Sequence, residues 1–282
     1  MFVLKVFSRL PLVVLYAISD FIFVITFYVI RYRRKVVMEN LRNSLPHKTE
    51  KDLRQIERRF FRNLCDYAAE MLRLLTISKK ELQERVVFTN ADVIKEFTNK
   101  NHSVLILAAH QFNWEWLLAA GCFNLPAPVD FVYQPQSSNL ANAFSIAIRT
   151  RFGGHPVKRE TVGREALRRK SIIRATAIVA DQYPGHFNHR KYWATFLGQQ
   201  TAFFHGISQL ATLTDAGAYF AAVKKTLRGH YEVTLIKLAS PPYTEETSLG
   251  IIDRYIEESE KVIHEQPEGW LWSHKRWKKL DY

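Results

Sequence analysis

Cysteine is scarce in this chain of 282 residues, which contains only Cys65 and Cys122. Two cysteines are too few for a disulfide-rich secreted scaffold or for a zinc site built from thiolates. A chain of this length can bury a sizeable core without metals or disulfides. We therefore expect one large domain, or one domain with an appendage, that is stabilised by ordinary packing.

Acidic residues are also in short supply. Asp and Glu number 27 against 40 Lys and Arg, so the formal net charge is +13 at pH 7. Internal repeats, low-complexity stretches and Pro/Ser-rich linkers are missing, and a hydrophobic fraction of 47% excludes a disordered protein. A globular protein with this excess of positive charge usually binds something anionic, such as nucleic acid, a membrane surface or a phosphorylated substrate.

One long apolar run is present, at residues 10–30, and Asp20 is its single charged residue. A helix that crosses a membrane needs about 20 mostly apolar residues, so this run is long enough. It is too long for a signal peptide, and no small-residue cleavage site follows it. A buried core helix stays open as an alternative, because a carboxylate is costly in lipid. We expect a membrane helix, spanning or partly embedded, whose Asp20 faces protein or a polar groove.

Positive charge gathers directly after this run. Residues 31–60 hold ten Lys or Arg against four Asp or Glu. Beside anionic lipid each basic residue gains about 1 kcal/mol, and the heavier positive flank on the C-terminal side favours a cytoplasmic main domain. The chain is therefore divided into a membrane anchor helix (1–30), a basic juxtamembrane helical segment (31–85) and a main domain (86–282).

Short apolar runs alternate with helical stretches in the main domain. The runs are typical of buried strands, and their alternation with helices predicts an α/β layered domain with a central, mostly parallel mixed sheet. Two later runs flank Arg228-Gly229 and predict an antiparallel hairpin. Upstream, the Thr49-x-x-Asp52 pattern predicts the start of a helix. The expected strands are 86–88, 103–109, 129–133 and 175–181, and the expected helices are 49–75, 91–99, 114–122, 138–151, 162–170 and 247–265.

His110 follows the expected strand 103–109, and Glu115 lies in the first turn of a helix that Asn113 can cap. The carboxylate could accept a hydrogen bond from one imidazole nitrogen, which would leave the other nitrogen free to take a proton from a substrate hydroxyl. The carboxyl ends of strands are also where α/β sheets bind ligands. By itself the H-x4-E pattern is weak, and a structural histidine beside a helix-capping glutamate explains it at least as well.

Further segments place polar residues where they could serve chemistry. Asp181 and Gln182 stand at the end of the strand 175–181, in the sequence DQYPG, and Gly198 in ATFLGQQTAF is expected to precede a helix. The segment 270–279, WLWSHKRWKK, combines three Trp with several basic residues. Its basic side chains either contact a substrate phosphate or only support the fold and membrane docking, while its tryptophans can simply cover the core.

Together these motifs resemble the late (secondary) acyltransferases of lipid A biosynthesis, within the membrane lysophospholipid acyltransferase superfamily. The resemblance covers nearly the full length. It rests on the apolar helix with the basic segment RYRRKVVMENL, on HQFNWE as the catalytic H-x4-D/E box, on the arginine/glycine box IRTRFGGHPVKRE, on DQYPG with FLGQQTAF, and on WLWSHKRWK. Two departures are Gln-Phe-Asn in the first box, where a small glycine often stands, and Tyr183-Pro184 in place of a second acid.

The resemblance implies a glycerolipid-acyltransferase-like fold and O-acyl transfer from an acyl thioester to a hydroxyl of a lipid A precursor. Acyl carrier protein or acyl-CoA would be the donor, an anionic phosphoglycolipid the acceptor, and no other cofactor would be needed. His110 would be the general base and Glu115 its partner. The expected location is the bacterial inner membrane, with the catalytic domain on the cytoplasmic side. Substrate binding is expected at Arg151, Asp181, Gln182, His274 and Arg276.

Other functions stay open. A related enzyme could acylate another membrane acceptor, such as a lysophospholipid, aminolipid or glycolipid. A non-catalytic basic membrane-surface protein is a further alternative, although the presence of both His110 and Glu115 disfavours an inactive relative. Binding to nucleic acid is disfavoured because the basic residues cluster beside the anchor and no nucleic-acid-binding motif is present.

A bound metal is not expected either. His186, His189 and His205 have no accompanying carboxylate or cysteine at ligand spacing. The remaining arginines near the candidate site, Arg149, Arg159 and those of residues 168–170, are expected to be surface charges.

Overall fold

The computed structural model describes residues 2–185 and 190–277. The N-terminal part is helical, and the predicted capping pattern at Thr49 is confirmed: its side chain accepts from the Asp52 amide, and the Asp52 carboxylate accepts from the Thr49 amide. The helices of this part are α1 (Phe2–Phe7), α2 (Leu12–Val24, continued by the π-helical η1, Ile25–Ile30), α3 (Arg34–Ser44), α4 (Glu50–Arg73) and α5 (Lys79–Arg85).

A seven-stranded sheet forms the centre of the rest of the chain, in the order β1-β9-β8-β2-β5-β3-β4. Its neighbouring strands are parallel except for β8 and β9, which form the predicted antiparallel hairpin. The α/β fold with a mostly parallel mixed sheet is thereby confirmed. The strands are β1 (Val86–Phe88), β2 (Val104–Ala108), β3 (Val129–Tyr133), β4 (His155–Lys158), β5 (Ala175–Val179), β8 (Gly217–Leu227) and β9 (His230–Ala239).

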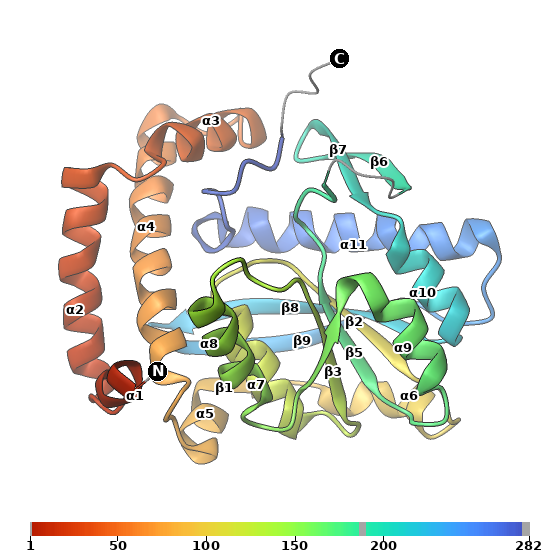
Figure 1. Cartoon of the computed structure of the whole chain (residues 1–282). Helices are drawn as coiled ribbons and strands as arrows, with labels where there is room; N and C mark the ends of the chain where they lie inside the picture. Colours follow the sequence, from red (N-terminus) through yellow and green to blue (C-terminus); the bar gives the residue numbers. More distant parts are fainter. Residues whose placement is uncertain (1, 186–189, 278–282) are drawn as a thin grey trace.

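Helices cover both faces of this sheet (Figure 1). Alternate side chains of β2 enter two different buried clusters, as the period of a strand requires: Leu105 belongs to one and Ile106 to the other. Side chains of α10 and α11 share the first cluster, and side chains of α5 and α7 share the second. The helices here are η2 (Ala91–Ile94), α6 (Lys95–Thr98), α7 (Trp114–Asn124), α8 (Asn139–Thr150), η3 (Arg159–Thr161), α9 (Val162–Arg168), α10 (Gly206–Thr214), α11 (Glu245–Glu265) and η4 (Pro267–Gly269).

The prediction of a helix directly after Gly198 is wrong. Strands β6 (Lys191–Phe196) and β7 (Gln199–Phe204) pair antiparallel there, and the next helix, α10, begins only at Gly206. Leu197 and Gly198 have φ values of 50° and 74°. Positive φ at both positions is the signature of a type I′ hairpin turn, whose backbone matches the twist of the strands.

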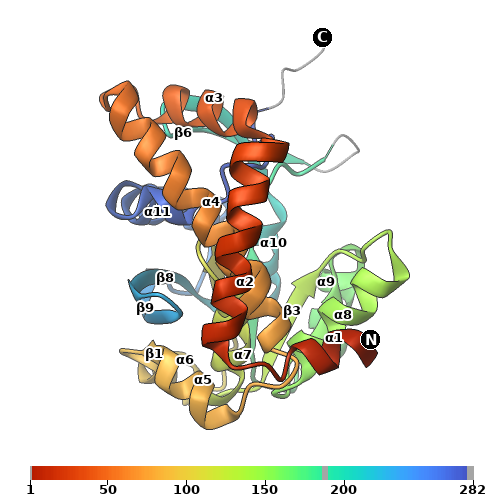
Figure 2. The ribbon, with the colours of Figure 1, turned by 90° about the vertical axis from the view of Figure 1, so that its left-hand side faces the viewer.

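The N-terminal helix α2 lies side by side with α4 at one end of the molecule (Figures 1 and 2). Phe23 and Phe27 are buried in the first cluster, and the Phe27 ring is 5.5 Å from that of Phe61 on α4. Asp20 forms an ion pair with Arg228, in the turn between β8 and β9, at 2.9 Å. The expectation that Asp20 faces protein is confirmed, and α2 is an integral part of the fold.

The opposite side of α2 is apolar and uncovered. Its residues include Val13, Phe21, Ile22 and Val29, all exposed. Within the described residues, Leu12–Ile30 is the helical stretch that is long and apolar enough to cross a membrane, judged by length and composition alone. Side chains of α2, α3 and α4 share a buried cluster with the sheet. The division of the chain into an anchor (1–30), a basic helical segment (31–85) and a main domain (86–282) stays a prediction.

Candidate active site

His110 and Asp181 meet at the carboxyl edge of the sheet. Strand β2 lies beside β5, with Ala108 level with Val179, so the residues that follow the two strands become neighbours. Oδ1 of Asp181 is 2.5 Å from Nδ1 of His110, and Oδ2 accepts from the His110 backbone amide at 2.9 Å. Oδ2 also accepts from the indole N–H of Trp270 at 2.7 Å. Asp181 therefore orients both the ring and the backbone of His110.

These contacts determine which imidazole nitrogen is basic. A carboxylate can only accept, so Nδ1 of His110 carries the proton and Nε2 of the neutral ring has the free lone pair. Nε2 lies 3.2 Å from Nε2 of the Gln182 amide, which can donate to it. The His110 side chain keeps 16% of its surface exposed. His110 is thus arranged as a base at Nε2, with Gln182 covering that nitrogen.

Asp181 is charged in this arrangement. Burial raises the pKa of its carboxyl, but attraction to the imidazolium that His110 becomes on taking a proton, with the hydrogen bonds from His110 and Trp270, outweighs burial, so the pKa lies below its ordinary value. A buried carboxylate that stays ionised beside an imidazole stabilises the imidazolium that forms when the ring takes a proton.

Glu115 does not make the hydrogen bond that the sequence predicts for it. Its oxygens accept from Nε and Nη2 of Arg149 at 2.8 and 2.6 Å, while Asp181 takes the expected place on Nδ1 of His110. Glu115 is 2% exposed, and Trp114 packs edge-on against His110. The expected catalytic role of Glu115 stays a prediction. Its hydrogen-bond partner is Arg149 and not His110.

Arg149 is likewise not the surface charge that the sequence suggested. Burial lowers the pKa of its guanidinium, but the bidentate pair with Glu115 raises it further, so the net direction is upward. The helix α8 brings Arg149 over the ring of Phe131, with 5.8 Å between the guanidinium carbon and the ring centroid. The residues near Arg149 in the sequence do not predict this pairing, because Glu115 lies on another helix.

The loop that carries His110 is held by the C-terminal segment. Leu271 donates its backbone amide to the carbonyl of His110 at 3.0 Å, and Phe112 donates to the carbonyl of Gly269 at 2.8 Å. Phe112 has a φ of 49°, which a residue other than glycine adopts only where its surroundings stabilise it. The Trp-rich motif therefore builds the site, through Trp270 on Asp181 and through these backbone contacts.

The basic segment that follows α2 and η1 supports the same motif from outside. On α3, the Asn40 side chain donates to the carbonyls of Trp272 and His274 at 2.8 and 3.0 Å, and Arg33 just before α3 donates to Ser273 at 3.1 Å. Part of the positive charge of this segment, that of Arg33, thus supports the fold. These hydrogen bonds hold the segments 31–41 and 270–277 together, and both segments carry motifs of the resemblance.

Arg276 is buried rather than open to a substrate. It is 1% exposed, donates to the carbonyl of Ala202 at 2.6 Å and lies over the ring of Phe203. Burial lowers its pKa to about 10. These contacts favour the alternative in which this part of the motif supports the fold. His274 is partly buried next to it.

Arg151 has different partners from those of the Glu115–Arg149 pair. Its Nη1 donates to the carbonyl of Leu74 at 3.1 Å, and its guanidinium stacks on Phe152. Arg151 is exposed and so could reach a substrate. Its role in binding stays a prediction. Of the substrate-binding residues expected from sequence, Asp181 and Gln182 make hydrogen bonds with the His110 ring.

Within residues 2–185 and 190–277, no group of three or more His, Cys, Asp or Glu side chains could hold a metal ion. His186 and His189, which prompted the question, lie outside the described residues. His205 is buried.

Comparison with known proteins places the sequence in a family. The sequence model of one protein family, described as bacterial lipid A biosynthesis acyltransferase, matches residues 1–279. No curated protein matches the chain in a sequence search.

Proposed function

Because the chain belongs to the bacterial lipid A biosynthesis acyltransferase family, we propose that it transfers an acyl chain from an acyl thioester to a hydroxyl of a lipid A precursor, with His110 as general base. The observation that carries this mechanism is the contact between Nδ1 of His110 and Asp181. That contact leaves Nε2 as the nitrogen that can take a proton.

In the proposed step, the acceptor hydroxyl displaces Gln182 from Nε2 of His110. The hydroxyl oxygen attacks the thioester carbonyl carbon while its proton passes to Nε2. The tetrahedral oxyanion then collapses, the carbon–sulfur bond breaks, and the leaving thiolate takes the proton back from the imidazolium. Asp181 stays ionised throughout and stabilises the imidazolium. No acyl-enzyme is needed, since burial raises the pKa of both Cys65 and Cys122 to about 11 and keeps them as thiols.

Glu115 and Arg149 are proposed to bind an anionic group of the reactants. Glu115 binds two of the guanidinium nitrogens of Arg149 and holds the group in one orientation. Nη1 is the nitrogen outside this ion pair, and we assign it to an anionic group of the reactants. Glu115 then acts as a positioning residue for Arg149. Arg151 and His274 are proposed as further contacts to substrate phosphate.

The partners follow from the chemistry. An acyl thioester is already activated, so no further cofactor is required. The excess of basic residues suits an acidic acyl carrier protein as donor and an anionic phosphoglycolipid as acceptor. The exposed apolar face of α2 and the family are consistent with a membrane-associated protein. We propose the cytoplasmic side of the inner membrane as its place of action.

The test uses the full chain with His110→Ala. We expect the variant to lose acyl transfer while it still sediments with membranes, because the change removes one partly exposed ring and leaves α2 intact. Mass spectrometry of membrane lipids with wild-type and variant protein would identify the acceptor and the added chain. Substantial turnover by the variant would exclude His110 as the base, and acylation of a lysophospholipid instead would exclude the proposed acceptor.

A further inference from the structure

Glu70, in the last turn of α4, is completely buried and contacts the segment that joins His110 to Glu115. Its Oε2 accepts from the side-chain amide of Asn113 at 2.6 Å. Its backbone carbonyl accepts from the indole N–H of Trp116 at 2.9 Å. Glu70 is therefore in direct contact with the start of α7, although the two residues that it binds lie more than forty positions further along the chain.

The bond from Asn113 to Glu70 fixes the cap of α7. Oδ1 of Asn113 accepts from the backbone amide of Trp116 at 2.9 Å, which is the contact that a helix cap makes. The oxygen and the nitrogen of an amide have fixed relative positions, so the second bond, from Nδ2 to Glu70, determines how the whole group is turned. Glu115, which binds Arg149, lies in the first turn after this cap. Glu70 thus holds the turn on which Glu115 lies.

A second side chain of α4 contacts the same turn. The ring of Tyr67 is 4.2 Å from that of Trp114. Trp114 in turn packs edge-on against His110, with 4.8 Å between the ring centroids. A displacement of the first turn of α7 would therefore move a ring that contacts His110.

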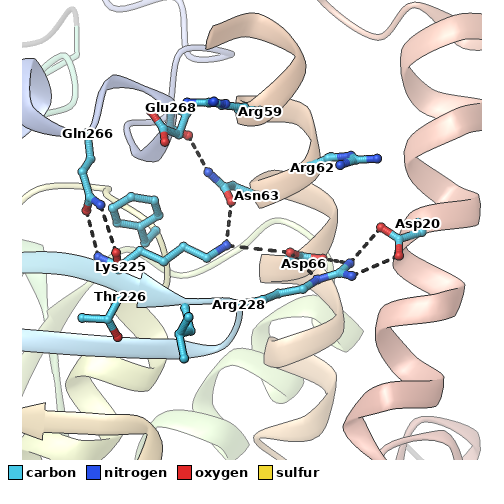
Figure 3. Close-up of a pocket in the computed structure, with 12 residues that line it drawn as sticks. Asp20, Arg59, Arg62, Asn63, Asp66, Lys225, Thr226, Arg228, Gln266 and Glu268 are labelled. Carbon is cyan, nitrogen blue, oxygen red and sulfur yellow. Dashed lines mark hydrogen bonds and ion pairs between the residues drawn. The ribbon is translucent and has the colours of Figure 1, made fainter. Parts of the chain in front are cut away.

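Glu70 forms no ion pair among the described residues. Its other donors are the hydroxyls of Tyr16, 2.8 Å from Oε1, and of Tyr231, 2.9 Å from Oε2. The cations of the β8–β9 hairpin, Lys225 and Arg228, donate to other side chains (Figure 3). A buried carboxylate that has only neutral donors is costly for stability. Proteins keep such costly groups mainly at functional sites.

We infer that Glu70 is a positioning residue for the proposed acyl transfer: by holding Asn113 it fixes the first turn of α7, with Trp114 against His110 and Glu115 on Arg149. The inference rests on the proposed function. Glu70 itself contacts neither the imidazole nor the guanidinium and acts through Asn113.

The position must supply an acceptor at Oε2, because Nδ2 of Asn113 can only donate, whereas a tyrosine hydroxyl can donate or accept. Glutamine meets this requirement, since its oxygen can accept from Asn113 while its nitrogen donates to the hydroxyl of Tyr16. Leucine does not meet it. Glu70→Gln is therefore the conservative variant, and Glu70→Leu removes the contact.

The kinetic test uses the full chain in detergent. Asn113→Ser keeps a capping oxygen but loses the amide donor, and Glu70→Leu loses the acceptor. We expect kcat to fall at least about tenfold in both variants with KM little changed, because a small displacement of the reacting groups slows the chemical step. Glu70→Gln should keep the wild-type kcat. If Glu70→Leu does not fold, Asn113→Ser decides the outcome.

The matched control is Tyr16→Phe, which removes a donor from the other oxygen of Glu70 and leaves the bond to Asn113 in place. Its kcat should equal that of the wild type even though a hydrogen bond to the same carboxylate is lost. An equal fall of kcat in Tyr16→Phe and Asn113→Ser would show general loosening of the fold and would overturn the inference. Equal loss in Glu70→Gln and Glu70→Leu would overturn the requirement for an acceptor.

A second readout needs no substrate. The Trp114 ring shifts the NMR resonances of the His110 ring protons, because the two rings are in contact. These resonances, assigned by their loss in His110→Ala, should move in Asn113→Ser and stay at their wild-type positions in Tyr16→Phe and Glu70→Gln. Unchanged resonances in Asn113→Ser would overturn the inference. A wild-type protein that transfers no acyl chain would instead refute the proposed function, and the resonances would still decide whether Glu70 positions His110.

Discussion

Asp181 accepts from Nδ1 of His110 across two neighbouring parallel strands, and the two residues are 71 positions apart in the chain. The same carboxylate accepts from the His110 backbone amide and from Trp270. Three donors on one buried carboxylate fix the tautomer of the imidazole and its direction. The orientation of the proposed general base is therefore defined by a contact between segments that are distant in sequence.

Replacing Asp181 with Asn should lower the rate of acyl transfer by about 10²–10⁴-fold. The amide keeps the size of the side chain but removes the charge that stabilises the imidazolium, and it can donate to Nδ1 and favour the wrong tautomer. The measurement is the single-turnover rate with saturating donor. Trp270→Phe is the matched control: it removes one donor to Asp181 without touching the ring and should cost much less. A wild-type rate for the Asn variant would contradict the assignment.

The pair of Glu115 and Arg149 should be energetically coupled. Removing one partner leaves the other charge buried, which costs about 3–5 kcal/mol. In a double-mutant cycle, Glu115→Gln and Arg149→Gln should each destabilise the protein strongly, and the double variant should lose less than the sum. The measurement is the free energy of unfolding by denaturant in detergent.

The exposed pair of Arg168 and Glu165 provides the comparison for this cycle. Arg168→Gln should change the free energy of unfolding by less than about 1 kcal/mol. Additive effects at Glu115 and Arg149 would mean that their ion pair does not contribute to the fold, and a positioning role for Glu115 would be excluded.

Stability should depend on pH through Glu70, which lies wholly buried on α4. Burial raises the pKa of its carboxyl, against opposing hydrogen bonds from Asn113 and Tyr231. The folded protein thus holds this proton more tightly than the unfolded chain does. The contribution to stability is complete below the ordinary glutamate value of 4.5 and is lost as the pH rises through the folded pKa.

Unfolding of the wild type and of Glu70→Gln, followed from pH 4.5 upward, checks this dependence. The wild type should lose stability relative to the variant over this range, because glutamine does not titrate. Glu84→Gln, at an exposed position, should follow the wild-type curve. Parallel curves for the wild type and Glu70→Gln would show that Glu70 does not titrate differently in the folded state.

Deleting residues 1–30 should destabilise the whole protein rather than release an intact main domain. The deletion uncovers Phe61 and removes Ser19 and Asp20 from the polar contacts of Asp66 and Arg228. Burial of one aromatic side chain alone contributes about 1.5–3 kcal/mol. Thermal unfolding in detergent should show a clearly lower midpoint.

A deletion of residues 2–7 is the control, because α1 has no buried residues. It should shift the midpoint far less. A soluble protein with a wild-type midpoint after loss of residues 1–30 would show that α2 is only an anchor.

Local sequence patterns were sufficient for several features of this protein. The capping pattern at Thr49, the strands around residues 104–108 and 129–133, and the hairpin at Arg228-Gly229 depend on neighbouring residues, and each is confirmed. The position of His110 at a strand end has the same origin. The helix expected after Gly198 failed because a turn with two positive φ values was read as the start of a helix.

The partners of the charged groups were decided by the tertiary structure. Sequence spacing pointed from His110 to Glu115 because they are five residues apart, but the strand order places β5 beside β2 and brings Asp181 to the ring. In the same way α8 brings Arg149 to Glu115, and the β8–β9 turn brings Arg228 to Asp20. The sequence by itself determined most of the elements, the position of His110 at a strand end and the apolar helix, because these follow from local backbone preference and hydrophobic period. Which carboxylate meets which cation depends on strand order and helix packing, and only the folded chain contains that information.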